Sequence, residues 1–483
     1  MNVFGPFEPD RTLYYPGVTT NAVNCLPVAD GWGPQADIVP FTDALPGACL
    51  GAVVVRTMAG SYRLIAGTAT GLFELNLTDY SWTTLTRLVG GAYAVPTGDR
   101  WSFAVFGQNL IACNLTDDVQ YIGIDAGTNF AALAGSPPKA KYVWIAGEFL
   151  VLGYLAGFPN RIHVSGLGDA THWTIGSRGS DLQDFPDGEE VSGGIGSERG
   201  AIIFQRTMIR QMTVQQVGDY SFQTAIVNPK RGVVAPLSIA QIGPGQFFYL
   251  SADGFFTGAE GKPIGAERVD RWFMSQIDTS KIDEIRSVAD PFNKIVWTQA
   301  ERPDTTKFLL GYNWQLDRWC YADNNVSEMC VMATPGVSWD ALDDLYPTID
   351  DVDVPFDSAL FNGGLPRFAA FTTGNLLGFF TGEARAATLD TADLELNPGF
   401  RTLVDAVRVY GDVTEFTLTA ITSDIHGGTR TAGNAKSPNA RSGLCHMRSD
   451  ARIHALRLDI AAGAAWNHVV GLECEDAQRT GRV

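Results

Sequence analysis

Short apolar runs separated by turn residues recur along most of the chain, and this pattern is typical of β-hairpins. Around Asp253-Gly254, for example, an aromatic run at 247–249 is followed after the turn by Phe255-Phe256. Glycine and aspartate readily adopt the left-handed backbone that tight hairpin turns need. The pattern predicts seven hairpins, at residues 52–68, 102–114, 142–154, 201–214, 246–261, 294–313 and 367–382.

The spacing of these hairpins predicts the fold class. A four-stranded propeller blade typically needs about 40–50 residues. Most intervals between successive hairpin starts have this length, whereas the third is slightly longer and the last is much longer. We therefore expect an all-β chain built around a β-propeller of six or seven blades. The alternative is a set of unrelated β-sandwiches with similar strand spacing.

The flanking segments differ from the repeated part. Residues 1–50 are rich in proline and aromatic side chains and are expected to form an extended docking arm, and residues 400–483 alternate again like a small β-domain. One helix is expected at 279–288, with Asp278 or Thr279 as its N-cap. The long last interval predicts an insertion. The expected organisation is an arm at 1–50, blades at 51–318, an acidic insertion at 319–366, a last blade at 367–399 and a C-terminal β-domain at 400–483.

The composition indicates many turns and a large excess of acidic over basic residues. Glycine supplies 52 of 483 residues, and the formal net charge is −18 with a pI of about 4.7. Such a charge argues against a protein that grips nucleic acid by neutralising phosphates, but it is compatible with a surface past which DNA slides.

The charge is unevenly distributed. Segment 319–366 has no Lys or Arg and contains nine acids, whereas 430–457 is basic, so the two are candidates for opposite surfaces. An acidic run is usually a solvated loop. The alternative is that it lines a lumen or a distal tip. The candidate residues for that acidic surface are Asp343, Asp344, Asp350, Asp351 and Asp353.

Seven scattered cysteines without a C-x-x-C pair predict free, mostly buried thiols in a reducing cytosol. A Cys320–Cys330 disulfide is the alternative. The beginning of the sequence has neither the basic nor the apolar region of a secretory signal, and no apolar stretch reaches the length of a membrane span. We expect a protein that does not insert into membranes by itself.

Catalytic and metal-binding motifs are nearly absent from the sequence. No zinc-protease, P-loop or nucleophile-elbow motif occurs, so no catalytic residue, cofactor or metal ligand is predicted. Cys445-His446 lacks a second pair at zinc-ligand spacing. An acidic stretch at 351–357 lacks the glycine of a calcium-binding loop and is interrupted by Pro355. The sequence therefore predicts a protein that is not an enzyme.

One tripeptide, Asp-Arg-Trp, recurs at 99–101, 270–272 and 317–319. Asp can close a turn through its own backbone, Arg can lie over an aromatic face, and Trp can anchor the next strand in the core. We therefore interpret the tripeptide as a structural element at turns and strand starts, in preference to a binding site. The candidate structural anchors are Trp101, Trp272, Trp314 and Trp319.

Short motifs with a distinctive order and spacing occur at 4–10, 24–27, 31–34, 43–46, 66–70, 99–103, 159–161, 164–166, 263–265, 269–273 and 313–319. Together they resemble a family of tailed-bacteriophage tail proteins, the tail nozzle or tail tubular protein B of short-tailed phages. The resemblance spans most of the chain.

The resemblance implies a structural subunit of the virion tail, assembled in the host cytoplasm. Six copies would form a ring below the portal and adaptor, bound to head-to-tail connector proteins and to tail fibres or spikes, through which double-stranded DNA passes during genome ejection. A hub or stopper in another tail type is an alternative. Two other classes stay open: a receptor- or carbohydrate-binding propeller on the virion, and a glycan-degrading propeller enzyme. The family supplies no catalytic residues.

Overall fold

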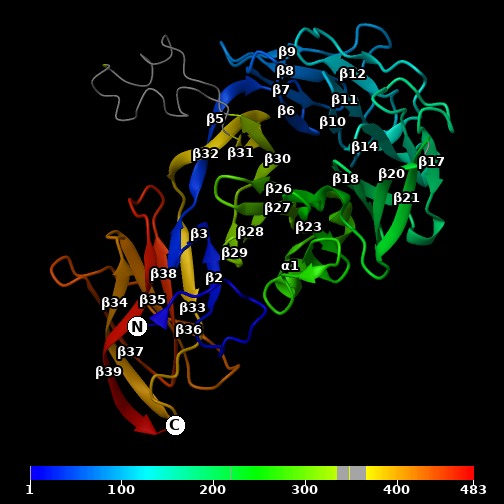
Figure 1. The fold of residues 1–483 in the computed structure, drawn as a ribbon. Helices are drawn as coiled ribbons and strands as arrows, with labels where there is room; N and C mark the ends of the chain where they lie inside the picture. The colour runs from blue at the N-terminus through cyan, green and yellow to red at the C-terminus, as the bar shows by residue number, and fades with distance from the viewer. Residues whose placement is uncertain (1, 218, 334–347, 349–365, 483) are drawn as a thin grey trace.

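The computed structural model describes residues 2–217, 219–333, 348 and 366–482. The described chain is nearly all β, and its strands form a ring of blades joined to a two-layered sandwich that carries both ends of the chain (Figure 1). Seven groups of four antiparallel strands make up the ring in this part of the chain. The predicted β-propeller is confirmed, with seven blades.

The blades follow one another along the sequence, each with its first strand at the centre of the ring. The first three are β6 (Ala52–Arg56), β7 (Tyr62–Gly67), β8 (Leu72–Leu75) and β9 (Trp82–Thr84); β10 (Ser102–Phe106), β11 (Asn109–Cys113), β12 (Gln120–Gly123) and β13 (Ala131–Ala132); β14 (Ala140–Ala146), β15 (Phe149–Leu155), β16 (Phe158–Val164) and β17 (Asp181–Asp184). The next three are β18 (Val191–Ser197), β19 (Gly200–Gln205), β20 (Ile209–Val217) and β21 (Asp219–Asn228); β22 (Ala240–Gly243), β23 (Gln246–Ser251), β24 (Gly254–Thr257) and β25 (Lys262–Pro263); β26 (Arg286–Asp290), β27 (Ile295–Glu301), β28 (Lys307–Asn313) and β29 (Arg318–Ala322).

The seventh blade closes the ring with a strand from the beginning of the chain. Its strands are β30 (Val326–Ala333), β31 (Pro366–Thr372), β32 (Leu376–Ala384) and, outermost, β5 (Ala36–Ala44). Phe379 of β32 faces Val39 of β5 in an antiparallel register. Because β5 precedes the first blade directly, this pairing ties the start of the propeller to its end.

The sandwich consists of two sheets that share an apolar core. One sheet contains β1 (Asn2–Val3), β3 (Cys25–Val28), β4 (Gly31–Pro34), β34 (Phe400–Gly411), β37 (Leu444–Ala451) and β39 (Val469–Arg482). The other contains β2 (Thr19–Val23), β33 (Ala387–Thr391), β35 (Phe416–Ser423), β36 (Thr431–Ala432) and β38 (Ile453–Ile460). Val407 of the first sheet and Leu458 of the second belong to the same buried cluster.

The second sandwich sheet continues into the sixth blade. Val23 of β2 pairs in parallel with Tyr321 of β29, so that nine strands form one sheet from β26 to β36. The same buried cluster extends from the sandwich through blades five, six and seven. The N-terminal residues are thus not an arm alone, since 1–50 contribute β1 to β4 to the sandwich and β5 to a blade.

The expected helix at 279–288 does not form. A 3₁₀ helix, η3 (Thr279–Glu284), follows Asp278, whose side chain caps it by accepting a hydrogen bond from the Ser280 N–H. Residue 286 already starts β26, where Arg286 pairs with Gln299. Pairing in the first strand of a blade overrides the local helical pattern. A short helix, α1 (Asp270–Gln276), lies just upstream.

The boundaries of the expected acidic insertion also differ from the structure. Residues 319–333 are mostly strand, because they contain the end of β29 and all of β30. The segment with extra length joins β30 to β31. All five candidate aspartates, at 343, 344, 350, 351 and 353, lie outside the described residues.

Each of the seven predicted hairpins corresponds to two neighbouring strands of a blade, but not to the same two strands in every blade. The first three join strands one and two of their blades, whereas the last four join strands two and three. This change in which strands form the hairpin explains why the interval between the third and fourth hairpins is longer than those beside it.

The seven cysteines are free, and six of them are buried. Cys320 and Cys330, on adjacent blades, form no disulfide.

Candidate functional site

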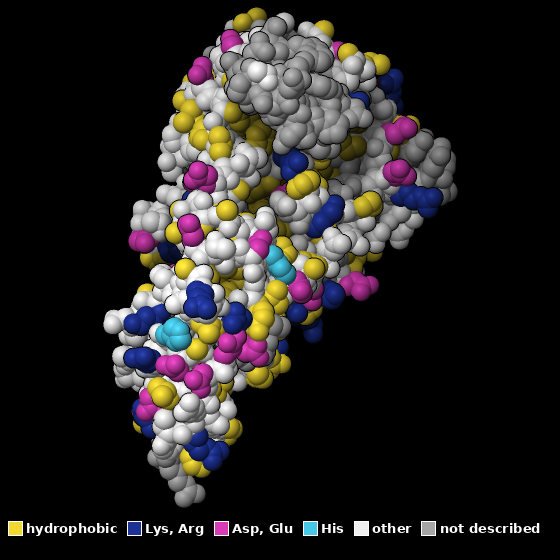
Figure 2. Space-filling model, turned by 90° about the vertical axis from the view of Figure 1, so that its left-hand side faces the viewer, with side chains coloured by type: hydrophobic (Ala, Val, Ile, Leu, Met, Phe, Trp, Pro, Cys, Tyr) yellow, Lys and Arg dark blue, Asp and Glu magenta, His cyan; other side chains and the backbone are white. Residues whose placement is uncertain are grey.

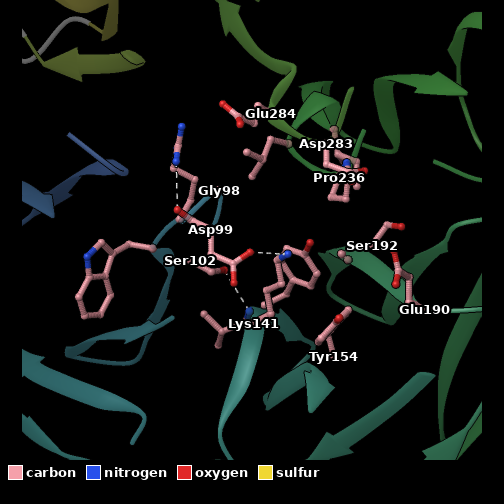
Figure 3. A pocket seen from close by; sticks show the side chains of 18 of the residues that line it. Gly98, Asp99, Ser102, Lys141, Tyr154, Glu190, Ser192, Pro236, Asp283 and Glu284 are labelled. Atoms are coloured by element: carbon pink, nitrogen blue, oxygen red, sulfur yellow. Dashed lines mark hydrogen bonds and ion pairs between the residues drawn. The ribbon is translucent and has the colours of Figure 1, made fainter. Parts of the chain in front are cut away.

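A cavity of about 670 Å³ lies at the centre of the propeller. The first strands of blades two to five, β10, β14, β18 and β22, line it together with η3 and the short 3₁₀ helix η2 (Pro236–Ser238). Most of its lining residues come from the beginnings of these strands and from the turns that precede them (Figure 3). Central strands converge in any propeller, and their first residues therefore meet here although they are far apart in sequence.

One wall holds an ion pair against two tyrosines. The Lys141 ammonium lies 2.6 Å from the Asp99 carboxylate. The same ammonium is 5.7 Å from the centre of the Tyr142 ring and 5.3 Å from that of Tyr154, within cation–π range. Burial, followed by the charge of Asp99, raises the pKa of Tyr142 well above its usual value, so this hydroxyl keeps its proton at neutral pH.

The orientation of Tyr154 depends on a β-bulge. The register between β15 and β16 shifts between Gly153 and Leu155, and Tyr154 adopts a left-handed backbone with φ of 54°. Few bulky residues adopt this conformation. A bulge redirects the side chain at its site, and here the redirected ring lies at the cavity (Figure 3).

Asp283 and Glu284 lie across the cavity from Lys141 and Tyr154, whereas Glu190 lies beside Tyr154 (Figure 3). Arg206 binds Glu190 at 3.0 Å and approaches Asp283 at 3.5 Å. The Glu284 carboxylate has no hydrogen-bond or ion-pair partner among the residues that the structure describes. Its charge acts on Arg100 and Lys281, but within the described ranges its oxygens accept no hydrogen bond.

A buried charge cluster adjoins the cavity through Arg100. The Glu328 carboxylate lies 3.4 Å from Arg100 Nε and also accepts a hydrogen bond from Arg286. Burial, followed by the charge of Arg100, lowers the pKa of Arg286 to about 9, and burial with the same two arginines lowers the pKa of Lys307 to about 8. One carboxylate serving two guanidinium groups holds the first strands of blades six and seven against the turn before blade two.

The predicted tryptophan anchors divide into two groups. Trp101 is 5% exposed and Trp319 is 1% exposed, and each indole N–H donates to a backbone carbonyl, of Thr68 and Ile264 respectively. Trp272 and Trp314 are only half-buried against the core. Trp272 lies on α1, not at the start of a strand. Of the four, Trp101 alone reaches the central cavity.

The basic segment 430–457 is largely neutralised by acids from elsewhere in the sandwich. Its pairs are Arg430 with Asp393, Arg448 with Asp405, Arg452 with Glu395 and Arg457 with Asp390, at 2.7, 3.5, 2.8 and 2.7 Å. Figure 2 shows basic and acidic side chains interspersed over the lower part of the molecule, which is the sandwich. The segment therefore does not form an uninterrupted basic surface on the face shown.

Sequence reasoning did not single out Lys141, Tyr154 or Glu284. The signal that could have found two of them is their position, because Lys141 lies in the first strand of a blade and Glu284 lies just before one. Tyr154 lies at the end of a second strand, which pairs beside the beginning of β14. Within the described ranges, no group of three or more His, Cys, Asp or Glu side chains is arranged to hold a metal ion. No helix in this part of the chain is long and apolar enough to cross a membrane.

No family model and no curated protein matches the chain. Among solved structures, one similar chain is that of U3-55K, with a TM-score of 0.36 and 10% identity over 60% of this chain and 86% of that one. Another is YCF48 bound to D1 peptide, with a TM-score of 0.36 and 10% identity over 62% and 92% of the two chains. The computationally designed Ika8 protein has a TM-score of 0.37 and 12% identity over 72% and 99%. Similarity at this level says nothing about function, and the propeller is established by the strand pairing itself.

Proposed function

We propose that the chain is a structural subunit of a bacteriophage tail that assembles into a ring, with six copies forming a nozzle for genome ejection below the portal and adaptor. The ordered motifs of the sequence are the origin of this proposal. The proposed partners are further copies of the chain, head-to-tail connector proteins and tail fibres or spikes, with DNA in transit.

The observation that supports a mechanical role is the way in which the propeller and the sandwich are joined. The nine-stranded sheet crosses from one to the other through the β2–β29 pair, and one buried cluster extends over both. A flexible linker would let the two parts reorient, whereas strand pairing and a shared core hold them in one arrangement. A conduit subunit that resists pressurised DNA needs such stiffness.

Several of the family-like motifs meet at this junction. Arg318 of the motif at 313–319 donates hydrogen bonds to the carbonyl oxygens of Val28 and Gly31, beside the motif at 31–34. Asp10, from the opening motif, accepts hydrogen bonds from the backbone N–H groups of Arg271 and Trp272. This supports the view that the motifs preserve an architecture and not a reactive site.

The proposal is tested by measuring whether the chain assembles into rings and whether it is located in the tail of virions. The purified full chain is examined by mass photometry and negative-stain electron microscopy, alone and with a head-to-tail adaptor protein of the same phage, and virions are labelled with an antibody against the chain. We expect rings of uniform subunit number and label at the tail. A chain that stays monomeric at high concentration with adaptor present, and is missing from virions, would contradict the proposal.

A further inference from the structure

We propose that the central cavity of the propeller is a binding site for a short neutral saccharide. The inference concerns a single chain and does not depend on ring assembly. It starts from the cavity of about 670 Å³, which falls within the roughly 300–1,000 Å³ typical of small-molecule sites. Four blades contribute to its lining, so its walls are held by the central strands of the fold.

The charges of the lining favour a neutral ligand. Four carboxylates, those of Asp99, Glu190, Asp283 and Glu284, face three basic side chains, those of Arg100, Lys141 and Lys281. Each of the three bases already has an acidic partner. An anion would meet four carboxylates and only bases that are already paired. A cation could pair only with Glu284, and there it would compete with Arg100 and Lys281, on which the Glu284 charge already acts. A charged ligand would therefore have to break an existing ion pair or lie beside a like charge, both of which are costly where water is partly excluded.

The uncharged hydrogen-bonding capacity of the lining fits hydroxyl groups. The hydroxyls of Tyr142 and Tyr154 have no hydrogen-bond partner within the described ranges, and neither does the Glu284 carboxylate. A carboxylate only accepts hydrogen bonds, whereas a phenol both donates and accepts. Sugar hydroxyls, which do both as well, match this combination. Leaving such groups unpaired when a ligand covers them would cost binding energy, so the site discriminates against a purely apolar ligand.

Two tyrosine rings in the cavity lining supply the apolar contacts that saccharide recognition also needs. The Tyr142 and Tyr154 rings meet edge to face with centroids 6.3 Å apart, and the Lys141–Asp99 pair fixes the polar groups beside them. The left-handed backbone of Tyr154 is a local cost that brings this ring to the cavity. Apolar C–H faces of a sugar can pack on the aromatic surface while its hydroxyls reach the acids opposite.

The test measures binding of defined sugars to the full-length chain. Glucose, galactose, N-acetylglucosamine, maltose and lactose are screened by saturation-transfer NMR and titration calorimetry, with spermidine and inorganic phosphate as charged probes. We expect at least one sugar to bind with a millimolar or lower Kd, and neither charged probe to compete. The absence of sugar binding, or binding of spermidine or phosphate in preference, would overturn the proposal.

Conservative variants assign the binding to the cavity. Tyr154→Phe removes one hydroxyl and is expected to weaken binding about three- to tenfold, and Glu284→Gln about tenfold or more, because a hydrogen bond to a charged group is worth more. The matched controls Tyr15→Phe and Glu148→Gln alter exposed residues elsewhere and should change the Kd less than twofold. Sugar binding that is equal in all four folded variants would place the site elsewhere and overturn the assignment. A failure of ring assembly would leave these measurements unaffected, so the two proposals fail separately.

Discussion

The guanidinium group of Arg318 lies over the Trp32 ring, 4.8 Å from its centre, and thereby joins the sixth blade to the N-terminal strands. Trp32 is fully buried, and its indole N–H donates to the Gly5 carbonyl, which also accepts from Arg318. One arginine thus stacks on an aromatic ring and donates to three backbone carbonyls of the same segment.

Arg318→Lys should therefore destabilise the chain although the charge is kept. An ammonium is a point charge that does not reproduce the planar fork or the stacking of a guanidinium. We expect a loss of about 1–3 kcal/mol in the free energy of unfolding, measured by urea denaturation, and faster proteolysis of the N-terminal segment that ends at Gln35. Arg441→Lys, at an exposed position, serves as control. Equal stability of the two variants would contradict this role for Arg318.

Trp319→Ala should be far more damaging than Trp314→Ala. Trp319 is 1% exposed and packs against Phe248, Phe255 and Tyr312, whereas Trp314 is half-buried. Truncating a fully buried tryptophan typically costs about 3–5 kcal/mol. The comparison is made by denaturant titration. Similar losses for both variants would show that burial does not distinguish the two.

Gly196→Ala should disrupt the packing of blade four on blade three. A Cβ atom at residue 196 would lie 1.4 Å from the Ile145 carbonyl oxygen, so backbone would have to move. We expect a loss of more than about 3 kcal/mol or a failure to fold, seen in soluble yield and thermal melting. Gly243→Ala, in the first strand of the next blade, is the matched control, because its nearest neighbour would be 3.6 Å away. A folded Gly196→Ala chain of parental stability would refute the close approach.

Asp270→Asn should stabilise the chain at neutral pH and lose that advantage in acid. Burial raises the pKa of Asp270 to about 6, above the value of about 3.9 for an unfolded aspartate. The charged form is therefore disfavoured by folding, and its cost is present above pH 6 and is relieved as the pH falls from about 6 to 4. Asn keeps the oxygen that accepts from the Phe255 N–H.

The measurement is the difference in unfolding free energy between this variant and the parent chain, followed from pH 7.5 to 4. A difference that does not change with pH would contradict the raised pKa. The exposed acid Asp304 provides a control, since Asp304→Asn removes a carboxylate that is not buried.

The local sequence predicted blades well and long-range pairings poorly. Turns such as Asp253-Gly254 and the apolar runs around them determine a hairpin within a few residues, so the seven hairpins and the propeller could be predicted. The partner of β5 is encoded nowhere near it, because β5 ends at Ala44 and β32 begins only at Leu376. The same holds for the pairing of Val23 with Tyr321, which joins β2 of the expected arm to the sheet of the sixth blade.

The cavity could not be predicted from the sequence for a related reason. Lys141, Tyr154 and Glu284 form no motif in sequence, and only the radial arrangement of the blades brings them together. Asp99 and Arg100 were noticed as part of a repeated tripeptide, but their contacts with Lys141 and Glu328 follow from where blades two, three and seven meet. Spacing along the chain carries no information about such contacts.

The position of β5 near the start of the sequence also determines when the ring can close during synthesis. A ribosome completes β5 at Ala44, but it completes the partner strand β32 only when it reaches Ala384. At about 5–20 residues per second, the delay is roughly 17–70 s. During that time β5 presents an unpaired edge, and such an edge can pair with the wrong strand or with another nascent chain. The ring therefore closes only late in translation, and the yield of native protein depends on keeping that strand free until then.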